Sequence, residues 1–198
     1  MRKGFLILLA LTVTALLAPA TQADELSDSL AKAQALYAQG KYTEAIAELN
    51  FAIAQIQTKQ MEQYETLFPV ALPTWTADKI ESQAGMAIMG GGISLSRYYH
   101  NEAGANVSVS IVSDSPMMSG MLMAMGNPLM LGGKKVVTIK GEKAVDDWDN
   151  DSKSGKLQII VDSRALITID GNSLEKKEDL LAYANAIDFA KLRAILKR

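Results

Sequence analysis

The sequence contains no cysteine and only one histidine among its 198 residues. The protein therefore forms no disulfide, has no thiolate nucleophile and cannot be lipidated on a cysteine. A second histidine for a zinc site and a Gly-x-Ser-x-Gly nucleophile elbow are absent too. The one imidazole, His100, stands beside Tyr99 and Glu102 and could act as an acid or base near neutral pH. We expect a non-catalytic protein without a cofactor. The weakest alternative is a hydrolase of unknown type with paired carboxylates, because the sequence does not show which carboxylates meet.

Basic residues are also few. The chain has 20 Lys and Arg against 22 Asp and Glu, for a net charge of −2. Nucleic-acid binding needs a basic stripe or patch, and an electrostatic membrane partner needs a polybasic cluster. Neither is present, so we expect no nucleic-acid partner. The apolar run at residues 5–17 is too short for a membrane anchor, so we also expect no stable membrane insertion.

The first 23 residues have the pattern of a secretory signal peptide. Arg2 and Lys3 precede the apolar run at 5–17, and small residues ending at Ala23 follow it. We expect cleavage after Ala23, with cleavage after Ala20 as the alternative. Removal of two basic residues leaves 18 basic against 22 acidic residues, a net charge of −4. The expected location is periplasmic or secreted.

Residues 24–67 show helical periodicity, broken once at Gly40. Apolar residues recur every three or four positions on both sides of the break, which predicts an antiparallel helical hairpin. The first helix is expected to present Leu26, Leu30, Ala33 and Tyr37, and the second Tyr42, Ile46, Leu49, Ile53, Ile56 and Tyr64.

Residues 35–53 of this hairpin resemble the second half of a tetratricopeptide (TPR) repeat. Small residues fall where that family packs one helix closely on the other: Ala33, Ala45 and Ala52. The resemblance covers about one repeat, 26–56, and the closing proline of the family is replaced by Gln57. A lone repeat cannot bury its own face. Either the hairpin docks on its own domain, or it is an arm for a periplasmic protein partner or for self-association.

Residues 68–78, with Pro69 and Pro73, are expected to be a linker, and 79–198 an α+β domain. A short helix is expected over 77–87. Alternation of apolar and polar residues predicts strands at 93–100, 106–112, 136–139 and 143–148.

The strongest strand signal is a hairpin from Lys156 to Asp170, set between Gly155 and Gly171 and broken at residues 162–164. Ser173 is expected to cap a final helix. Strands grouped between helices indicate α+β with a mostly antiparallel sheet of five to six strands, flanked by helices. This order, with Pro73-Thr-Trp75, resembles the Mog1/PsbP-like fold. It also resembles exported bacterial proteins to which no activity is assigned, so the resemblance implies none.

A methionine-rich segment follows Ser115-Pro116, which predicts the start of a helix. Thioethers are soft ligands for Cu(I), and helical spacing would bring several of them to one face. Packing and an adaptable apolar surface for a peptide or lipid are the competing interpretations. The candidate ligands are Met117, Met118, Met121 and Met125.

Two further motifs fit known sites poorly. Aspartates at 147, 149 and 151 repeat the opening spacing of an EF-hand loop, but Ser152 and Gln158 replace its glycine and its closing glutamate. A solvated loop between strands is therefore favoured over weak calcium binding. The glycines at 90–92 lack the Lys-Ser/Thr pair of a phosphate-binding loop and predict a flexible loop or bulge.

Overall fold

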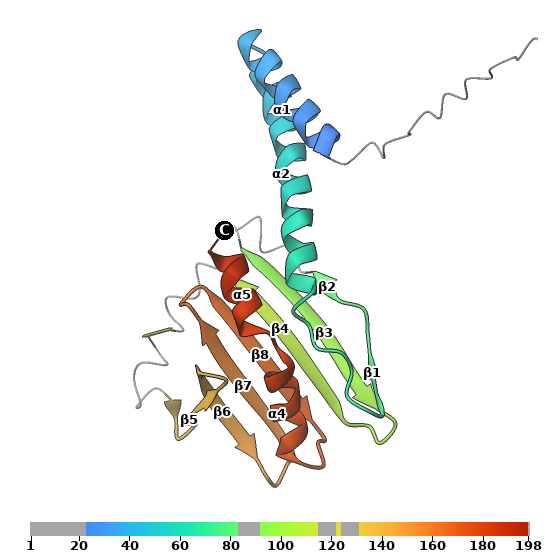
Figure 1. Ribbon diagram of the computed structural model, residues 1–198, viewed down its shortest axis with the longest axis vertical. Coiled ribbons are helices and arrows are strands. Elements are labelled where there is room, and N and C mark those ends of the chain that lie inside the picture. The colour runs from blue at the N-terminus through green and yellow to red at the C-terminus, as the bar shows by residue number, and fades with distance from the viewer. Residues whose placement is uncertain (1–22, 83–91, 115–121, 124–130, 198) are drawn as a thin grey trace, which may run out of the picture. The chain divides into compact units, whose positions relative to one another are not determined.

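The computed structural model describes residues 23–82, 92–114, 122–123 and 131–197 (Figure 1). The chain forms two compact units, the first ending at Ile56 and the second starting at Gln57. The described residues contain four helices and eight strands. The predicted α+β class is confirmed.

The first unit is the predicted antiparallel helical hairpin. Helix α1 spans Ala23–Ala38, and α2 spans Tyr42–Glu65, so α2 continues into the second unit. Gly40 ends α1 with a φ of 76°, a left-handed conformation that glycine adopts without steric cost. The amide of Lys41 then donates to the carbonyl of Leu36, which satisfies one of the last carbonyls of the helix.

The second unit is built on one antiparallel sheet in the order β1-β3-β4-β8-β7-β6-β5, with β2 also paired to β3. The strands are β1 (Trp75–Ala77), β2 (Glu81–Ser82), β3 (Ile93–Asn101), β4 (Asn106–Ser113), β5 (Lys135–Ile139), β6 (Glu142–Asp149), β7 (Ser154–Val161) and β8 (Ala165–Asn172). The sheet has more strands than the five to six expected because β1 and β2 are too short to show periodicity. They pair with separate parts of β3, at residues 99–101 and 95–96.

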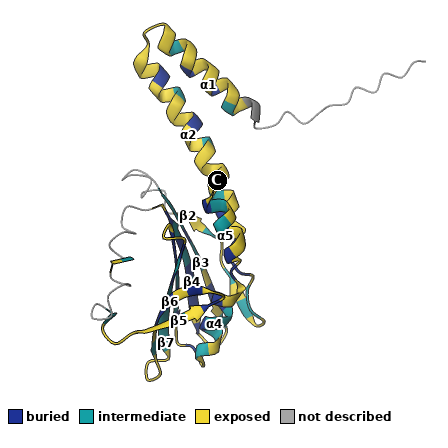
Figure 2. Ribbon diagram, turned by 60° about the vertical axis from the view of Figure 1, so that its left-hand side comes forward, coloured by how far each residue is buried: buried dark blue, intermediate teal, exposed yellow. Residues whose placement is uncertain are grey.

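The core lies on one face of this sheet. Val107, Val109 and Ile111 of β4 are fully buried, while the serines between them are half-buried or exposed. This is the predicted alternation of a strand with one wet face. Two helices cover the buried face: α4 (Lys177–Ala186) and α5 (Phe189–Leu196) (Figures 1 and 2).

The hairpin predicted at 156–170 is confirmed as β7 and β8. The turn comprises residues 162–164; Asp162 and Ser163 have positive φ, and the amide of Arg164 donates to the carbonyl of Val161. Gly155 and Gly171 do not bound the strands; they pair with each other inside them. A Cβ on Gly171 would lie 2.5 Å from Leu174 Cδ1, so the missing side chain makes room for that residue.

The residues expected to form a linker contribute to the second unit. Phe68 is buried in the core, and Trp75 starts β1 with its ring edge-on to Tyr183, 5.7 Å between centroids. The helix predicted over 77–87 is wrong for the described part, residues 77–82. Ala77 ends β1 and residues 81–82 form β2, because backbone pairing with β3 outweighs a weak local helical pattern.

The prediction that Ser173 caps the helix after β8 is also wrong. Helix α4 starts at Lys177, and its N-cap residue, Lys176, makes no side-chain capping bond. Ser173 instead has a φ of 54° three residues earlier, in the turn that follows β8. Across the described part of the chain, no helix has the length and apolarity needed to span a membrane.

Candidate functional site

The most distinctive surface of the first unit is an apolar groove between α1 and α2. Its volume is about 380 Å³, and its lining is apolar apart from Gln34 and the hydroxyl groups of two tyrosines. The eight lining residues are Leu30, Ala33, Gln34, Tyr37, Tyr42, Ala45, Ile46 and Leu49. We call this surface the hairpin groove.

Small residues contribute to the floor of the hairpin groove: Ala33 and Ala45 line it and are buried. Ala52 is buried farther along α2, and these are the three alanines at which the TPR resemblance implies close helix packing. Because alanines let the helices approach closely, the longer side chains beside them are left at the surface. The large apolar side chains of the groove are 43–67% exposed, and Figure 2 shows the hairpin as mostly exposed.

The apolar stripe of α2 extends beyond the groove. Tyr42, Ile46 and Leu49 line the groove, and Ile53 and Ile56 continue the same face at 49% and 46% exposure. Folded proteins normally keep exposed apolar patches small, and a larger one marks an interaction surface. The hairpin groove with this extension is such a patch.

A second candidate is a polar pocket of about 230 Å³ in the second unit, beside the start of β5. It brings together the acidic run and several lysines that are distant in sequence. The lining residues are Gly132, Gly133, Lys134, Lys135, Asp146, Asp147, Trp148, Asn150 and Lys177. We call this the lysine–aspartate pocket.

Asp146 is the unusual member of the lysine–aspartate pocket because its side chain is only 5% exposed. Its Oδ2 accepts a hydrogen bond from Lys177 Nζ at the start of α4. Its Oδ1 is buried and has no partner within the described structure. Sequence reasoning missed this pair because 31 residues separate the two and neither stands in a motif.

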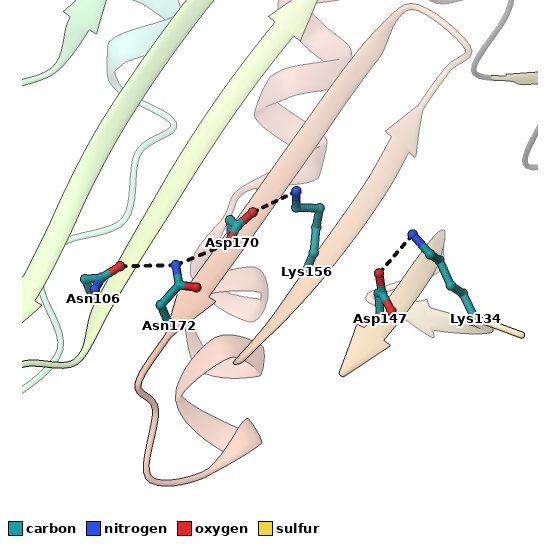
Figure 3. Close-up of polar contacts among 6 residues, drawn as sticks. All are labelled: Asn106, Lys134, Asp147, Lys156, Asp170 and Asn172. Carbon is teal, nitrogen blue, oxygen red and sulfur yellow. Dashed lines mark hydrogen bonds and ion pairs between the residues drawn. The ribbon is translucent and has the colours of Figure 1, made fainter. Parts of the chain in front are cut away.

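The wet face of the sheet carries charges in rows across neighbouring strands (Figure 3). Asp147, Lys156 and Asp170 are cross-strand neighbours on β6, β7 and β8. Lys156 Nζ lies 2.8 Å from Asp170 Oδ2, and Lys134 Nζ lies 2.9 Å from Asp147 Oδ2. Since positive and negative groups alternate along the row, this face has no field of one sign to attract a charged ligand.

The other aspartates of the acidic run serve the turn after β6. Asp149 accepts hydrogen bonds from the amide of Asp151 and the hydroxyl of Ser152. These bonds lower the pKa of Asp149, the amide bond contributing most. No cluster of three or more His, Cys, Asp or Glu side chains that could hold a metal ion occurs in the described residues. The EF-hand-like spacing is therefore not matched by a converging set of oxygens there.

His100 lies near the end of β3 on the surface. Its Nδ1 is 3.6 Å from a carboxylate oxygen of Asp78, and both side chains are about half exposed. His100 lines neither the hairpin groove nor the lysine–aspartate pocket, so it is not brought together with Asp146 and Asp147 there.

The candidate copper ligands Met117, Met118, Met121 and Met125 lie outside the described residues. Of this segment the structure describes Leu122 and Met123, and the side chain of Met123 is 73% exposed. Of the glycines at 90–92, only Gly92 is described; a Cβ there would lie 2.8 Å from the carbonyl oxygen of Ser113. Gly92 thus permits a close backbone approach just before β3.

Comparison with known proteins adds no assignment. No protein-family model, curated protein or solved structure matches the chain. The TPR-like and Mog1/PsbP-like resemblances therefore stay predictions.

Proposed function

We propose that the chain is an exported, non-catalytic accessory protein that binds a protein partner through the hairpin groove. The observation that supports this most is the apolar stripe of α2, which the hairpin itself leaves about half exposed. The signal-like pattern of residues 1–23 supports export, and the absence of cysteine agrees with it.

The hairpin has almost no core of its own. In residues 25–56, the buried side chains are Ser29, Ala33, Ala45 and Ala52. Burial of three methyl groups and one hydroxymethyl group contributes only a few kcal/mol, on the order of 0.8 kcal/mol per methyl-sized group. Ordering more than thirty residues costs much more than this in conformational entropy. We therefore expect a partner whose surface covers the apolar stripe and so stabilises the hairpin.

A protein fits the hairpin groove better than a small apolar ligand does. Small-molecule sites enclose most of their ligand, burying roughly 70–90% of its surface. The walls of the hairpin groove are themselves about half exposed, so a small ligand would remain largely in water. A helix laid along α2 would instead contact Tyr42, Leu49 and Ile56 together, in the way amphipathic helices occupy grooves.

Site-specific photo-cross-linking tests this proposal. Tyr42, 60% exposed, is replaced by benzoylphenylalanine in the full chain expressed in cells, and Tyr98 on β3, 46% exposed, is replaced as the matched control. We expect one discrete protein adduct from position 42 and none from position 98. Equal labelling at both positions, or no adduct at position 42, contradicts a docking role for the groove.

Export is tested by the mass of the mature chain. We expect the purified periplasmic protein to begin at Asp24, with Thr21 as the alternative start. A chain that keeps its first 20 residues in the cytoplasmic fraction contradicts export. This measurement is independent of the cross-linking result.

A further inference from the structure

We infer that the occupant of the hairpin groove is a second copy of the same hairpin, so that two chains form a four-helix bundle. This inference rests on the proposed docking role of the groove and names its partner. It follows from the spacing of the stripe, from the charges around it and from its area.

The stripe has the spacing of a coiled-coil seam. Its members on α2 are separated by four, three, four and three residues: Tyr42, Ile46, Leu49, Ile53 and Ile56. This is an average repeat of 3.5 residues, at which two helices keep their apolar faces in contact along their length. A partner must present the same repeat to match it. A second α2 does so by construction.

The residues beside the stripe carry no charge. Thr43, Asn50 and Gln57 flank it on one side, and the buried Ala45 and Ala52 flank it on the other. The charged side chains of α2 before Gln57 are Glu44 and Glu48, and Glu48 Oε1 is 2.5 Å from Lys32 Nζ on α1. Flanking charges normally select a different partner or repel an identical one. Neutral flanks allow two identical helices to meet without like charges facing each other.

The exposed area is sufficient for a modest dimer. Seven large apolar side chains of the hairpin, each about half exposed, offer on the order of 500–600 Å² per chain. They are Leu30, Tyr37, Tyr42, Ile46, Leu49, Ile53 and Ile56. Two chains would then bury about 1,000–1,200 Å², which is at the lower limit for a specific interface. The flanking residues add to this area.

A two-fold axis makes the contact self-complementary. Leu49 is the middle residue of the stripe, so an axis through it places Leu49 of one chain against Leu49 of the other. The stripe then extends two residues of the seam to either side. Because each chain fills the groove of the other, the contact closes at two copies and does not propagate.

Sedimentation velocity of the processed full chain tests the oligomeric state. We expect a dimer at micromolar concentration, a monomer for Leu49→Glu, and a dimer for Phe51→Glu. Phe51 is the matched control because it is 54% exposed on α2, against 43% for Leu49, but lies off the stripe. The dissociation constant of Leu49→Glu should rise at least tenfold. Circular dichroism checks that both variants keep their helices.

A cysteine cross-link tests the contact without weakening it. The chain has no cysteine, so Leu49→Cys carries a single thiol, and Val70→Cys, at a site 83% exposed in the second unit, is the control. We expect a disulfide-linked dimer only from Leu49→Cys under mild oxidation. This variant also gives a result if Leu49→Glu fails to fold.

The outcomes separate the two proposals. A monomeric wild-type chain, a dimer that survives Leu49→Glu, a higher oligomer, or equal cross-linking of both cysteine variants overturns the two-chain bundle. If the adduct from benzoylphenylalanine at position 42 contains a different protein, the groove is a docking site but its occupant is not a second copy. If the adduct contains this chain, both proposals are supported.

Discussion

Replacing Lys177 by methionine should destabilise the second unit strongly. Among the described residues, Lys177 is the cation that contacts the carboxylate of Asp146, which is 5% exposed and has one oxygen without a partner there. Methionine keeps the length of the side chain, so the loss is mainly of charge. The buried carboxylate is then left uncompensated.

The expected loss is about 2–3 kcal/mol. Breaking a fully buried ion pair on one side costs roughly 3–5 kcal/mol. The Lys177 side chain is partly exposed, at 29%, so solvent screens the pair. The loss of stability should therefore lie at the lower end of that range. Lys177 also lies at the N-terminus of α4, where a cation is unfavourable, and its removal recovers a few tenths of a kcal/mol.

Thermal and urea unfolding of the full chain measure the effect. A loss of this size corresponds to a fall in Tm of about 5–10 °C for a domain of this size. The matched control is Lys156→Met, which breaks a more exposed pair with Asp170 and should cost less than about 1 kcal/mol. The double variant Asp146→Leu/Lys177→Met should be more stable than Lys177→Met alone, since it removes the unpaired charge. If Lys177→Met loses no more stability than Lys156→Met, the argument from burial is wrong.

Three further predictions concern the second unit. Gly171→Ala should lower the free energy of unfolding by about 1–3 kcal/mol, because its Cβ would lie 2.5 Å from Leu174 Cδ1. In a Leu174→Ala background the same substitution should cost less, which urea unfolding measures. Burial raises the pKa of Tyr99 to about 12, above the value near 10 in an unfolded chain, so stability should fall as the pH rises from about 10 to 12. The free energy of unfolding should decrease by about 2–3 kcal/mol over this pH range, and the decrease should be smaller for Tyr99→Phe in the same pH series. Asp188→Ala removes the side chain that caps α5 and should lower the free energy of unfolding by about 0.5–2 kcal/mol; Lys176→Ala, at the uncapped start of α4, should cost less.

The sequence predicted the long elements well because each has a face that must be buried. Val107, Val109 and Ile111 alternate with serines, and only a strand brings the three to one side. The hairpin at β7 and β8 carries the same kind of signal twice. In these segments the local conformational preference agrees with tertiary burial, so the local sequence is enough to infer both.

The sequence could not predict features that depend on contacts between distant residues. The two- and three-residue strands β1 and β2 exist because β3 offers backbone partners, and no periodicity reveals this. Gly155 and Gly171 resemble turn signals locally, but their role is to leave space for Trp148 and Leu174. The pairing of Asp146 with Lys177 likewise depends on how α4 crosses the sheet.

The site was predictable only in part. Periodicity identified the stripe of α2, and the resemblance to a TPR repeat implied close helix packing at Ala33 and Ala45, which are buried. It could not show that the stripe stays exposed, because an amphipathic pattern has the same form whether its apolar face is covered by its own domain or by a partner. Exposure is a property of the whole fold.

The two edges of the sheet, as far as the structure describes them, have a consequence for aggregation. On one side, strand pairing along β3 is interrupted after Ala77, where Arg97 Nε donates to the carbonyl of Asp78. On the other, β5 is five residues long and begins with Lys135, preceded by Lys134. Short, interrupted or lysine-bearing edges discourage strands of other molecules from adding to a sheet. The second unit is thus protected against fibril-like stacking even when crowded, and recognition by strand addition is disfavoured there.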